Sequence, residues 1–201
     1  MSIVSDIEKL KKEKNAVILA HYYVDEDVQD VADYIGDSFY LSKVATKVSQ
    51  DRIIFAGVEF MGESAKILNP KKRVFMPDMN ADCPMAHMAD KDEILALREK
   101  YDDIAVVCYI NSTAELKKYS DVCVTSSNAV KIVKNLPNKN IFFIPDRNLG
   151  SYVAKQCPDK NFIFNNGCCP RHVVITKDMV LKAKELHPEA RFAAHPECTE
   201  D

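Results

Sequence analysis

The chain has 201 residues, of which 47% are hydrophobic and 28% charged, and its formal net charge at pH 7 is −3. This length and composition are typical of a globular protein with one large domain or two small ones. The slight negative charge and scattered basic residues argue against nucleic acid as a partner, and the longest apolar runs are too short for a membrane-spanning helix.

Residues 1–84 alternate short apolar runs with segments of helical period. Residues 3–14 are charged and amphipathic, unlike a signal peptide, so we expect a cytoplasmic location. The capping-box pattern from Ser5 to Glu8 predicts a first helix, and the continuously apolar run 16–20 predicts a buried strand. The other elements predicted here are helices over 25–34, 38–48 and 62–68 and strands over 53–56 and 73–76.

The following residues repeat this order of elements. After a helix that ends before Tyr101, we predict strands over 104–108, 122–124, 141–144 and 162–164, and helices over 114–119, 127–136 and 149–156. Thr176 is expected to cap a helix that reaches Leu186, and residues 191–194 are expected to form the first strand of a third unit.

Strands that alternate with helices indicate βαβ units with parallel sheets. We therefore predict an α/β fold built from αβα three-layer units with short parallel sheets. Residues 1–84 and 85–170 are expected to form two complete units, and residues 171–201 the start of a third, incomplete unit.

Polar residues recur where the predicted strands end, in three pairs spaced i and i+2: His21 and Tyr23, Tyr109 and Asn111, and His195 and Glu197. The first pair lies 88 residues before the second, and the second lies 86 residues before the third. Open parallel sheets bind ligands beyond the carboxyl ends of their strands, so we expect these pairs to line one active site.

Ser38 and Ser126 also lie 88 residues apart, and each precedes a predicted helix. Helix capping alone would explain both serines. A helix N-terminus with a nearby hydroxyl is also a favourable phosphate site, so a shared phosphate is the functional alternative.

Seven cysteines in a chain expected to be cytoplasmic do not predict structural disulfides. Cys108 and Cys123 lie in strand-like runs and are expected to be buried as small apolar residues. Cys83 and Cys169 lie 86 residues apart, and each precedes a proline. One such thiolate per repeat would hold a cubane cluster and leave one iron free to bind substrate.

Ordered motifs extend along the chain: residues 20–23, 29–38, 55–66, 77–79, 82–83, 109–112, 125–129, 145–150, 167–172 and 195–198. Among them, AHYY, PDRNLG and HPEC are the sequences of residues 20–23, 145–150 and 195–198. Together these motifs resemble those of the quinolinate synthases.

The resemblance implies a pseudo-threefold protein of three αβα domains around one [4Fe–4S] cluster held by three cysteines. It also implies condensation of iminoaspartate with dihydroxyacetone phosphate to quinolinate, phosphate and water, in de novo NAD biosynthesis. L-aspartate oxidase or aspartate dehydrogenase would supply the iminoaspartate. Nucleic acid and membranes are not expected partners.

The resemblance also implies roles for individual residues. Cys83 and Cys169 would be cluster ligands, with the third ligand expected beyond residue 201. Tyr23 and Glu197 are the acid/base candidates. The catalytic residues would be Tyr23, Tyr109, His195 and Glu197, and the substrate-binding residues His21, Ser38, Asn111, Ser126 and His172.

Two features depart from the family pattern. Residues 165–169 read Asn-Asn-Gly-Cys-Cys, whereas the family commonly has Trp-x-Gly-x-Cys. Cys168 is thus an additional thiol, and we assign the ligand to Cys169 from its spacing to His172. The chain also ends early in the third domain, so we expect a fragment whose activity by itself is doubtful.

Two other functions fit the residues. One is a non-catalytic remnant that binds a phosphorylated metabolite through Ser38 and Ser126. The other is a zinc-dependent hydrolase that uses His21, His195 and Glu197, with zinc held by nitrogen and oxygen.

Overall fold

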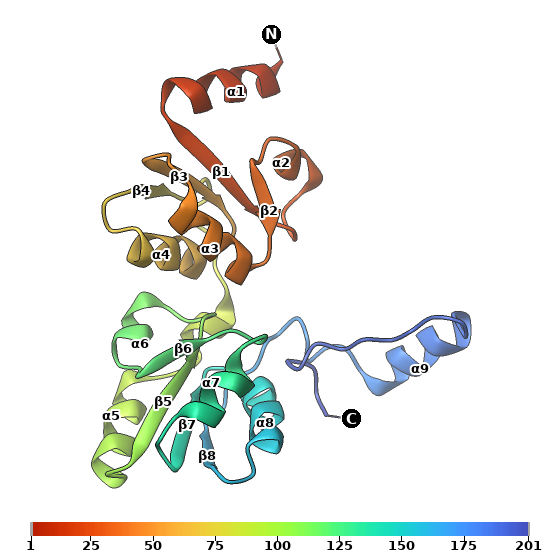
Figure 1. The fold of residues 1–201 in the computed structure, drawn as a ribbon. Coiled ribbons are helices and arrows are strands. Elements are labelled where there is room, and N and C mark those ends of the chain that lie inside the picture. Colours follow the sequence, from red (N-terminus) through yellow and green to blue (C-terminus); the bar gives the residue numbers. More distant parts are fainter. Residues whose placement is uncertain (1, 201) are drawn as a thin grey trace. The chain divides into compact units, whose positions relative to one another are not determined.

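Two four-stranded parallel sheets form the framework of the chain (Figure 1). The structure is a computed structural model, and it describes residues 2–200. The chain divides into two compact units, Met1–Cys83 and Pro84–Asp201. Each unit has one sheet, and helices alternate with strands throughout, which confirms the predicted α/β class.

In the first unit the sheet order is β2-β1-β3-β4. The strands are β1 (Ala16–His21), β2 (Tyr34–Gly36), β3 (Arg52–Ala56) and β4 (Arg73–Phe75). The helices are α1 (Ile3–Glu13), α2 (Glu26–Asp30), α3 (Ser38–Lys47) and α4 (Glu59–Leu68).

The second unit has the equivalent sheet order, β6-β5-β7-β8. Its strands are β5 (Ile104–Tyr109), β6 (Val122–Val124), β7 (Asn140–Ile144) and β8 (Asn161–Phe164). Its helices are η1 (Pro84–His87), α5 (Lys91–Lys100), α6 (Ala114–Lys118), α7 (Ala129–Asn135), α8 (Arg147–Gln156) and α9 (Lys177–Leu186). Each of the four strands begins 88 residues after its counterpart in the first unit, the interval at which the polar residues recur.

Helices cover both faces of the second sheet. Ile94 of α5 and Leu116 of α6 pack against Val106, Cys108 and Phe142 on one face. The chain moves in one direction along the sheet from β6 to β7 to β8, and in the opposite direction from β5 to β6. Because such crossovers are right-handed, α7 and α8 lie on the other face. Cys108 and Tyr109 therefore point to opposite faces at the end of β5.

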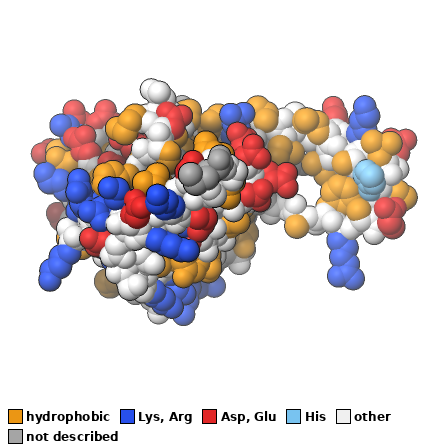
Figure 2. Space-filling view, turned by 90° about the horizontal axis from the view of Figure 1, so that it is seen from above, with side chains coloured by type: hydrophobic (Ala, Val, Ile, Leu, Met, Phe, Trp, Pro, Cys, Tyr) orange, Lys and Arg blue, Asp and Glu red, His pale blue; other side chains and the backbone are white. Residues whose placement is uncertain are grey.

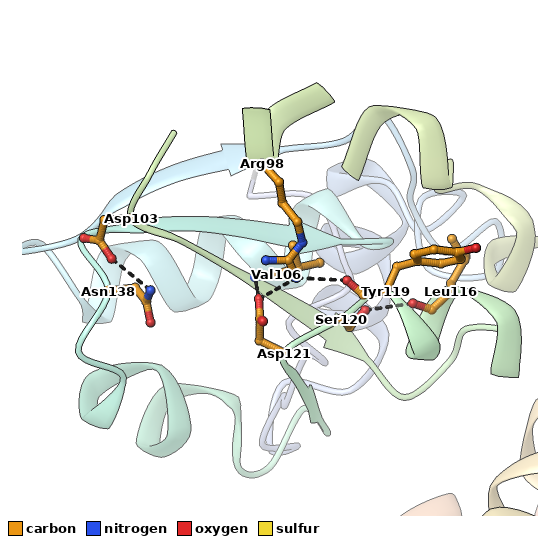
Figure 3. Close-up of polar contacts among 8 residues, drawn as sticks. All are labelled: Arg98, Asp103, Val106, Leu116, Tyr119, Ser120, Asp121 and Asn138. Carbon is orange, nitrogen blue, oxygen red and sulfur yellow. Dashed lines mark hydrogen bonds and ion pairs between the residues drawn. The ribbon is translucent and has the colours of Figure 1, made fainter. Parts of the chain in front are cut away.

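One aspartate in each unit joins the central strand to its edge strand. Asp33 Oδ2 accepts a hydrogen bond from Ile18 N at 2.8 Å, and Lys11 Nζ lies 2.9 Å from Asp33 Oδ1. In the second unit Asp121 Oδ2 accepts from Val106 N at 2.7 Å and from Arg98 Nη2 at 2.8 Å (Figure 3). The sequence repeat thus preserves a contact that fixes the edge strand beside the central strand.

Replacing Asp121 with alanine should lower the free energy of unfolding of the second unit. The Val106 N–H and the Arg98 guanidinium would both lose an acceptor, and we expect a cost of about 1–2 kcal/mol because water reaches this carboxylate. Hydrogen exchange would localise the effect, with faster exchange at Val106 N than at Ile18 N. Equal acceleration at both amides would contradict this account.

Three details differ from the predictions. The first residue of α1 is Ile3 and its cap is Ser2, three residues before the predicted cap Ser5. The caps of α3 and α7 are Asp37 and Asn128, so neither Ser38 nor Ser126 is an N-cap. Asp37 accepts from Tyr40 N at 2.7 Å, which satisfies the helix start one residue earlier.

The predicted strand over residues 191–194 is wrong. These residues have no regular secondary structure, because no strand within residues 171–200 can pair with them. The predicted helix 25–34 is shorter, and its last residue belongs to β2, which pairs with β1.

Helix α9 begins after Thr176, whose side chain accepts from Met179 N at 3.3 Å, as predicted. None of its residues is buried. Figure 2 shows orange hydrophobic side chains on the surface of this segment, around the pale-blue histidine at the right of the view. The exposed large apolar residues of α9 and its flanking residues are Val174, Ile175, Met179, Leu181, Leu186 and Phe192. None of the helices within residues 2–200 is long and apolar enough to cross a bilayer.

Candidate active site

Three potential metal ligands converge in the second unit. The ligand atoms of Cys169, His172 and Glu197 all lie within 4.8 Å of one another. His172 Nδ1 is 2.8 Å from Glu197 Oε2 and 3.1 Å from Cys169 Sγ. Glu197 is only 2% exposed, and such a carboxylate requires compensating donors or cations. The sequence predictions had named all three residues.

Tyr109 and His195 extend this cluster. The Tyr109 side chain, at the end of β5, hydrogen-bonds to Glu197, and burial together with that carboxylate raises the pKa of Tyr109. The His195 ring lies 5.1 Å from the His172 ring, and burial lowers the pKa of His195. Burial also raises the pKa of the Cys169 thiol to about 12, with a further contribution from Glu197. Without a cation nearby, Cys169 is therefore protonated at neutral pH.

A buried aspartate holds the Cys169 segment in place. Asp146 caps α8 by accepting from Leu149 N at 2.7 Å, and its other oxygen accepts from Cys169 N at 2.9 Å. Burial raises the pKa of Asp146 to about 6. Gly167 approaches this corner so closely that an added Cβ would lie 2.3 Å from Pro145 O. Only glycine can therefore occupy position 167 without moving the backbone.

The first unit carries a second set of predicted site residues. His21 ends β1 and is 8% exposed, and its ring lies 3.9 Å from the Tyr23 ring. The Tyr23 hydroxyl is 3.9 Å from Met61 Sδ. Burial raises the pKa of Tyr23 to about 12, a hydrogen bond with the Val58 backbone opposes the rise, and Cys83 adds to it. Tyr23 is therefore a protonated phenol at neutral pH and a potential proton donor.

The two histidines that begin equivalent sequence pairs, His21 and His195, share one local geometry. His21 Nδ1 accepts from Tyr23 N, and His195 Nδ1 accepts from Glu197 N, both at 3.3 Å. In the neutral imidazole this leaves the proton on Nε2, so each ring offers an N–H donor. The backbone N–H two residues after each histidine thus sets its tautomer.

The remaining predicted residues lie at the ends of strands or at helix starts. Ser38 is the first residue of α3, and Ser126 lies in the turn before α7. Asn111 follows β5, and its buried Oδ1 has no hydrogen-bond partner. A buried acceptor without a donor is unusual and is consistent with a ligand that supplies one.

Comparison with known proteins identifies the family. The family described as "Quinolinate synthetase A protein" matches residues 5–201. This chain belongs to the quinolinate synthase family.

Three relatives named quinolinate synthase are more than 50% identical to this chain over the matched segments. Quinolinate synthase from Fusobacterium nucleatum is 62% identical over 195 residues, which cover 97% of this chain and 65% of the relative. The protein of the same name from Caldicellulosiruptor saccharolyticus is 55% identical, over 98% of this chain and 65% of the relative. The protein of the same name from Clostridium perfringens is 52% identical, over 100% of this chain and 67% of the relative. The chain thus spans about 65% of the length of the first two quinolinate synthases.

Membership in the quinolinate synthase family confirms the resemblance found in the sequence. It favours neither the metabolite-binding remnant nor the zinc-dependent hydrolase. The ligand group found in the structure also differs from the set expected for such a hydrolase, because Cys169 and His172 join Glu197 in place of His21 and His195.

Two supporting residues had no predicted role. Asp146 anchors Cys169, and Asn148 Nδ2 donates to the Glu197 backbone oxygen at 2.9 Å. Both belong to the PDRNLG motif of the family resemblance, and an aspartate directly before a helix is a capping signal. Their contacts to residues 23 and 49 positions away could be found only in the folded chain.

The neutral state of His21 predicts a pH-dependent stability. Burial lowers the pKa of His21 from 6.5 to about 4, so the unfolded chain binds a proton more readily than the folded one. Stability from this group is complete above pH 6.5 and is lost as the pH falls towards 4, by about 1–3 kcal/mol. Urea unfolding of a His21→Gln variant should therefore show a weaker dependence over this pH range. A His187→Gln control changes the exposed residue directly after α9 and should retain the pH dependence of stability of the unmodified chain.

Proposed function

We propose that this chain forms part of a quinolinate synthase, which condenses iminoaspartate with dihydroxyacetone phosphate to quinolinate, phosphate and water. The observation that carries the proposal is the convergence of Cys169, His172 and Glu197 beside Tyr109 in a member of this family. The curated relatives have that name, and the activity is transferred to this chain as a proposal.

The Cys169 thiol is compatible with a role as a metal ligand. A thiol with a pKa raised to about 12 beside a buried carboxylate would be stabilised as a thiolate by a cation. We assign Cys83 and Cys169 as ligands of a [4Fe–4S] cluster, which cysteine thiolates hold in proteins. When bound, such a cluster supplies an iron that polarises a carbonyl or a departing hydroxyl.

Three side chains are suited to proton transfer. Tyr23 and Tyr109 have raised pKa values and keep their phenolic protons at neutral pH, so each can donate a hydrogen bond to a substrate oxygen, and we assign both as the groups that pass a proton to it. Glu197 is a buried carboxylate that receives hydrogen bonds from neighbouring donors, and we assign it as the base that accepts a proton from substrate carbon or nitrogen.

Substrate binding is assigned to side chains that can donate hydrogen bonds to the substrate or accept them from it. The Nε2–H groups of His21 and His195 suit carboxylate or carbonyl oxygens. His172 would complete this set of imidazole donors, and Asn111 has an oxygen available for a substrate N–H or O–H. Ser38 and Ser126 would bind the phosphate of dihydroxyacetone phosphate.

The same proposal defines the partners and the location. An L-aspartate oxidase or an aspartate dehydrogenase would supply iminoaspartate, and neither nucleic acid nor a membrane is expected to bind. The protein is proposed to act in the cytoplasm, as one step of NAD biosynthesis.

The test compares this chain with a chimera. In the chimera, the chain is continued by the part of the Fusobacterium nucleatum quinolinate synthase that follows its matched segment. After anaerobic reconstitution, iron, sulfide and quinolinate formation are measured for both. The proposal expects the chimera to hold a cluster and to produce quinolinate, and a Glu197→Gln chimera to keep its iron but lose most activity. A chimera without iron and without product would overturn the proposal.

A further inference from the structure

Two cysteines outside the candidate active site lie side by side on neighbouring strands. Cys108 of β5 and Cys123 of β6 are register partners in the parallel pairing of these strands. Adjacent strands lie about 4.8 Å apart, within the Cα separation of about 4.4–6.8 Å that disulfides span. The spacing of neighbouring strands is thus within the range of Cα separations that a disulfide bridges.

Both side chains project from the same face of the sheet, because register partners share a pleat. Cys108 is fully buried and packs with Ile94 of α5 and Leu116 of α6. Cys123 belongs to edge strand β6 and is exposed to solvent, which corrects the prediction that both thiols are buried. One thiol is therefore accessible to a reagent, and the other is shielded directly beside it.

Contacts around β6 hold this arrangement. Asp121, two residues before Cys123, binds Val106 N of β5 and Arg98 of α5, and Ser120 Oγ donates to Leu116 O at 2.9 Å (Figure 3). These bonds join the strand that carries Cys123 to the strand and helices around Cys108. The two thiols are close enough to influence each other's pKa, and the Cys108 thiol donates to the Tyr109 backbone oxygen at 3.4 Å.

The pair is separate from the candidate active site. Tyr109, the next residue along β5, points to the opposite face and hydrogen-bonds to Glu197. Neither Cys108 nor Cys123 belongs to the potential metal-ligand group of Cys169, His172 and Glu197. The proposed synthase chemistry does not use these two thiols.

We propose that Cys108 and Cys123 form a dithiol exchange site that reacts with low-molecular-weight disulfides such as glutathione disulfide. The Cys123 thiolate attacks one sulfur of the reagent and releases one thiol, which gives a mixed disulfide on Cys123. Cys108 then attacks Cys123 Sγ and releases the second thiol. The two cysteines are oxidised to one disulfide, and the reagent is reduced to two thiols, which take up the two protons that the cysteines lose.

The environment of Cys108 suits the second step. While both cysteines are reduced, their interaction lowers the pKa of Cys108 and raises that of Cys123. Once Cys123 is a mixed disulfide it has no S–H to donate, and the hydroxyls of Ser112 and Ser120 are the groups that still favour a Cys108 thiolate. Its fixed position next to Cys123 gives the ring-closing attack the advantage of an intramolecular reaction.

Tryptic mapping after exposure to glutathione disulfide tests the proposal. The native chain is incubated with the reagent, quenched in acid, alkylated under denaturing conditions and digested. Peptide 101–117 carries Cys108 as its one cysteine, peptide 119–131 carries Cys123, and peptide 156–160 carries Cys157. We expect peptides 101–117 and 119–131 to be joined by a disulfide that dithiothreitol breaks. Cys157, a buried thiol, is the internal control and should stay reduced.

Two variants distinguish formation of the mixed disulfide on Cys123 from its resolution by Cys108. In Cys108→Ala the glutathione adduct on Cys123 should accumulate about tenfold over the unmodified chain, because the resolving thiol is absent. In Cys123→Ser the linked peptide should be lost and Cys108 should remain reduced. The proposal is overturned if the folded, unmodified chain keeps both thiols reduced, or if it accumulates the Cys123 adduct as strongly as Cys108→Ala does. Circular dichroism of each variant shows whether it is folded.

Discussion

The Cys169→Ser chimera is expected to bind at least about tenfold less iron than the unmodified chimera after anaerobic reconstitution. Cys169 Sγ lies within 4.8 Å of ligand atoms on His172 and Glu197, in a buried position that favours a thiolate only when a cation is present. A serine hydroxyl fills similar space but is a poor ligand for iron–sulfur clusters. Iron content and visible absorption measure the loss independently of enzymatic activity.

Cys168 provides a matched control for this substitution. It is the adjacent residue, it also precedes the Pro170 turn, and it does not belong to the group of potential metal ligands. The Cys168→Ser chimera should therefore retain its iron and its absorption. If Cys168→Ser loses the iron and Cys169→Ser keeps it, the ligand assignment must be exchanged between the two cysteines.

Replacing Asp146 with asparagine should lower the free energy of unfolding by about 1–3 kcal/mol at pH 8. Asp146 is fully buried, and its two oxygens accept from Leu149 N and Cys169 N. Asparagine keeps the shape but places an amide N–H₂ against one of these backbone N–H groups, which leaves that donor without an acceptor. Urea unfolding followed by circular dichroism measures the change.

The same substitution should also weaken metal binding, because Asp146 positions the Cys169 backbone. Asp90→Asn is the matched control: Asp90 caps α5 in the same unit, is exposed, and accepts from Asp92 N at 2.8 Å. Asp90→Asn should lower the free energy of unfolding by about 1 kcal/mol or less and leave iron binding of the chimera unchanged. Equal loss of iron in both variants would show that helix capping alone explains the effect and that Asp146 does not position the ligand.

The order of elements could be predicted from the sequence because its determinants are local. The continuously apolar run 16–20 and its counterpart 104–108 had to be buried strands, and Thr176 alone was sufficient to indicate the start of α9. The 88-residue repeat was visible in part because both units require an aspartate directly before the edge strand. Asp33 and Asp121 have this role, since each binds the central strand beside it.

The tertiary structure decided which of the candidate residues meet. Cys169, His172 and Glu197 are brought together by the chain from residue 169 to residue 197, and no periodicity predicts a contact that depends on irregular backbone. The supporting role of Asp146 and the pairing of Cys108 with Cys123 depend on contacts between distant residues. The sequence by itself thus determined the αβα units, the family and the candidate residues, because hydrophobic period and motifs are local. Distances, tautomers and pKa shifts required the fold, because burial and neighbouring charges arise only when distant segments pack together.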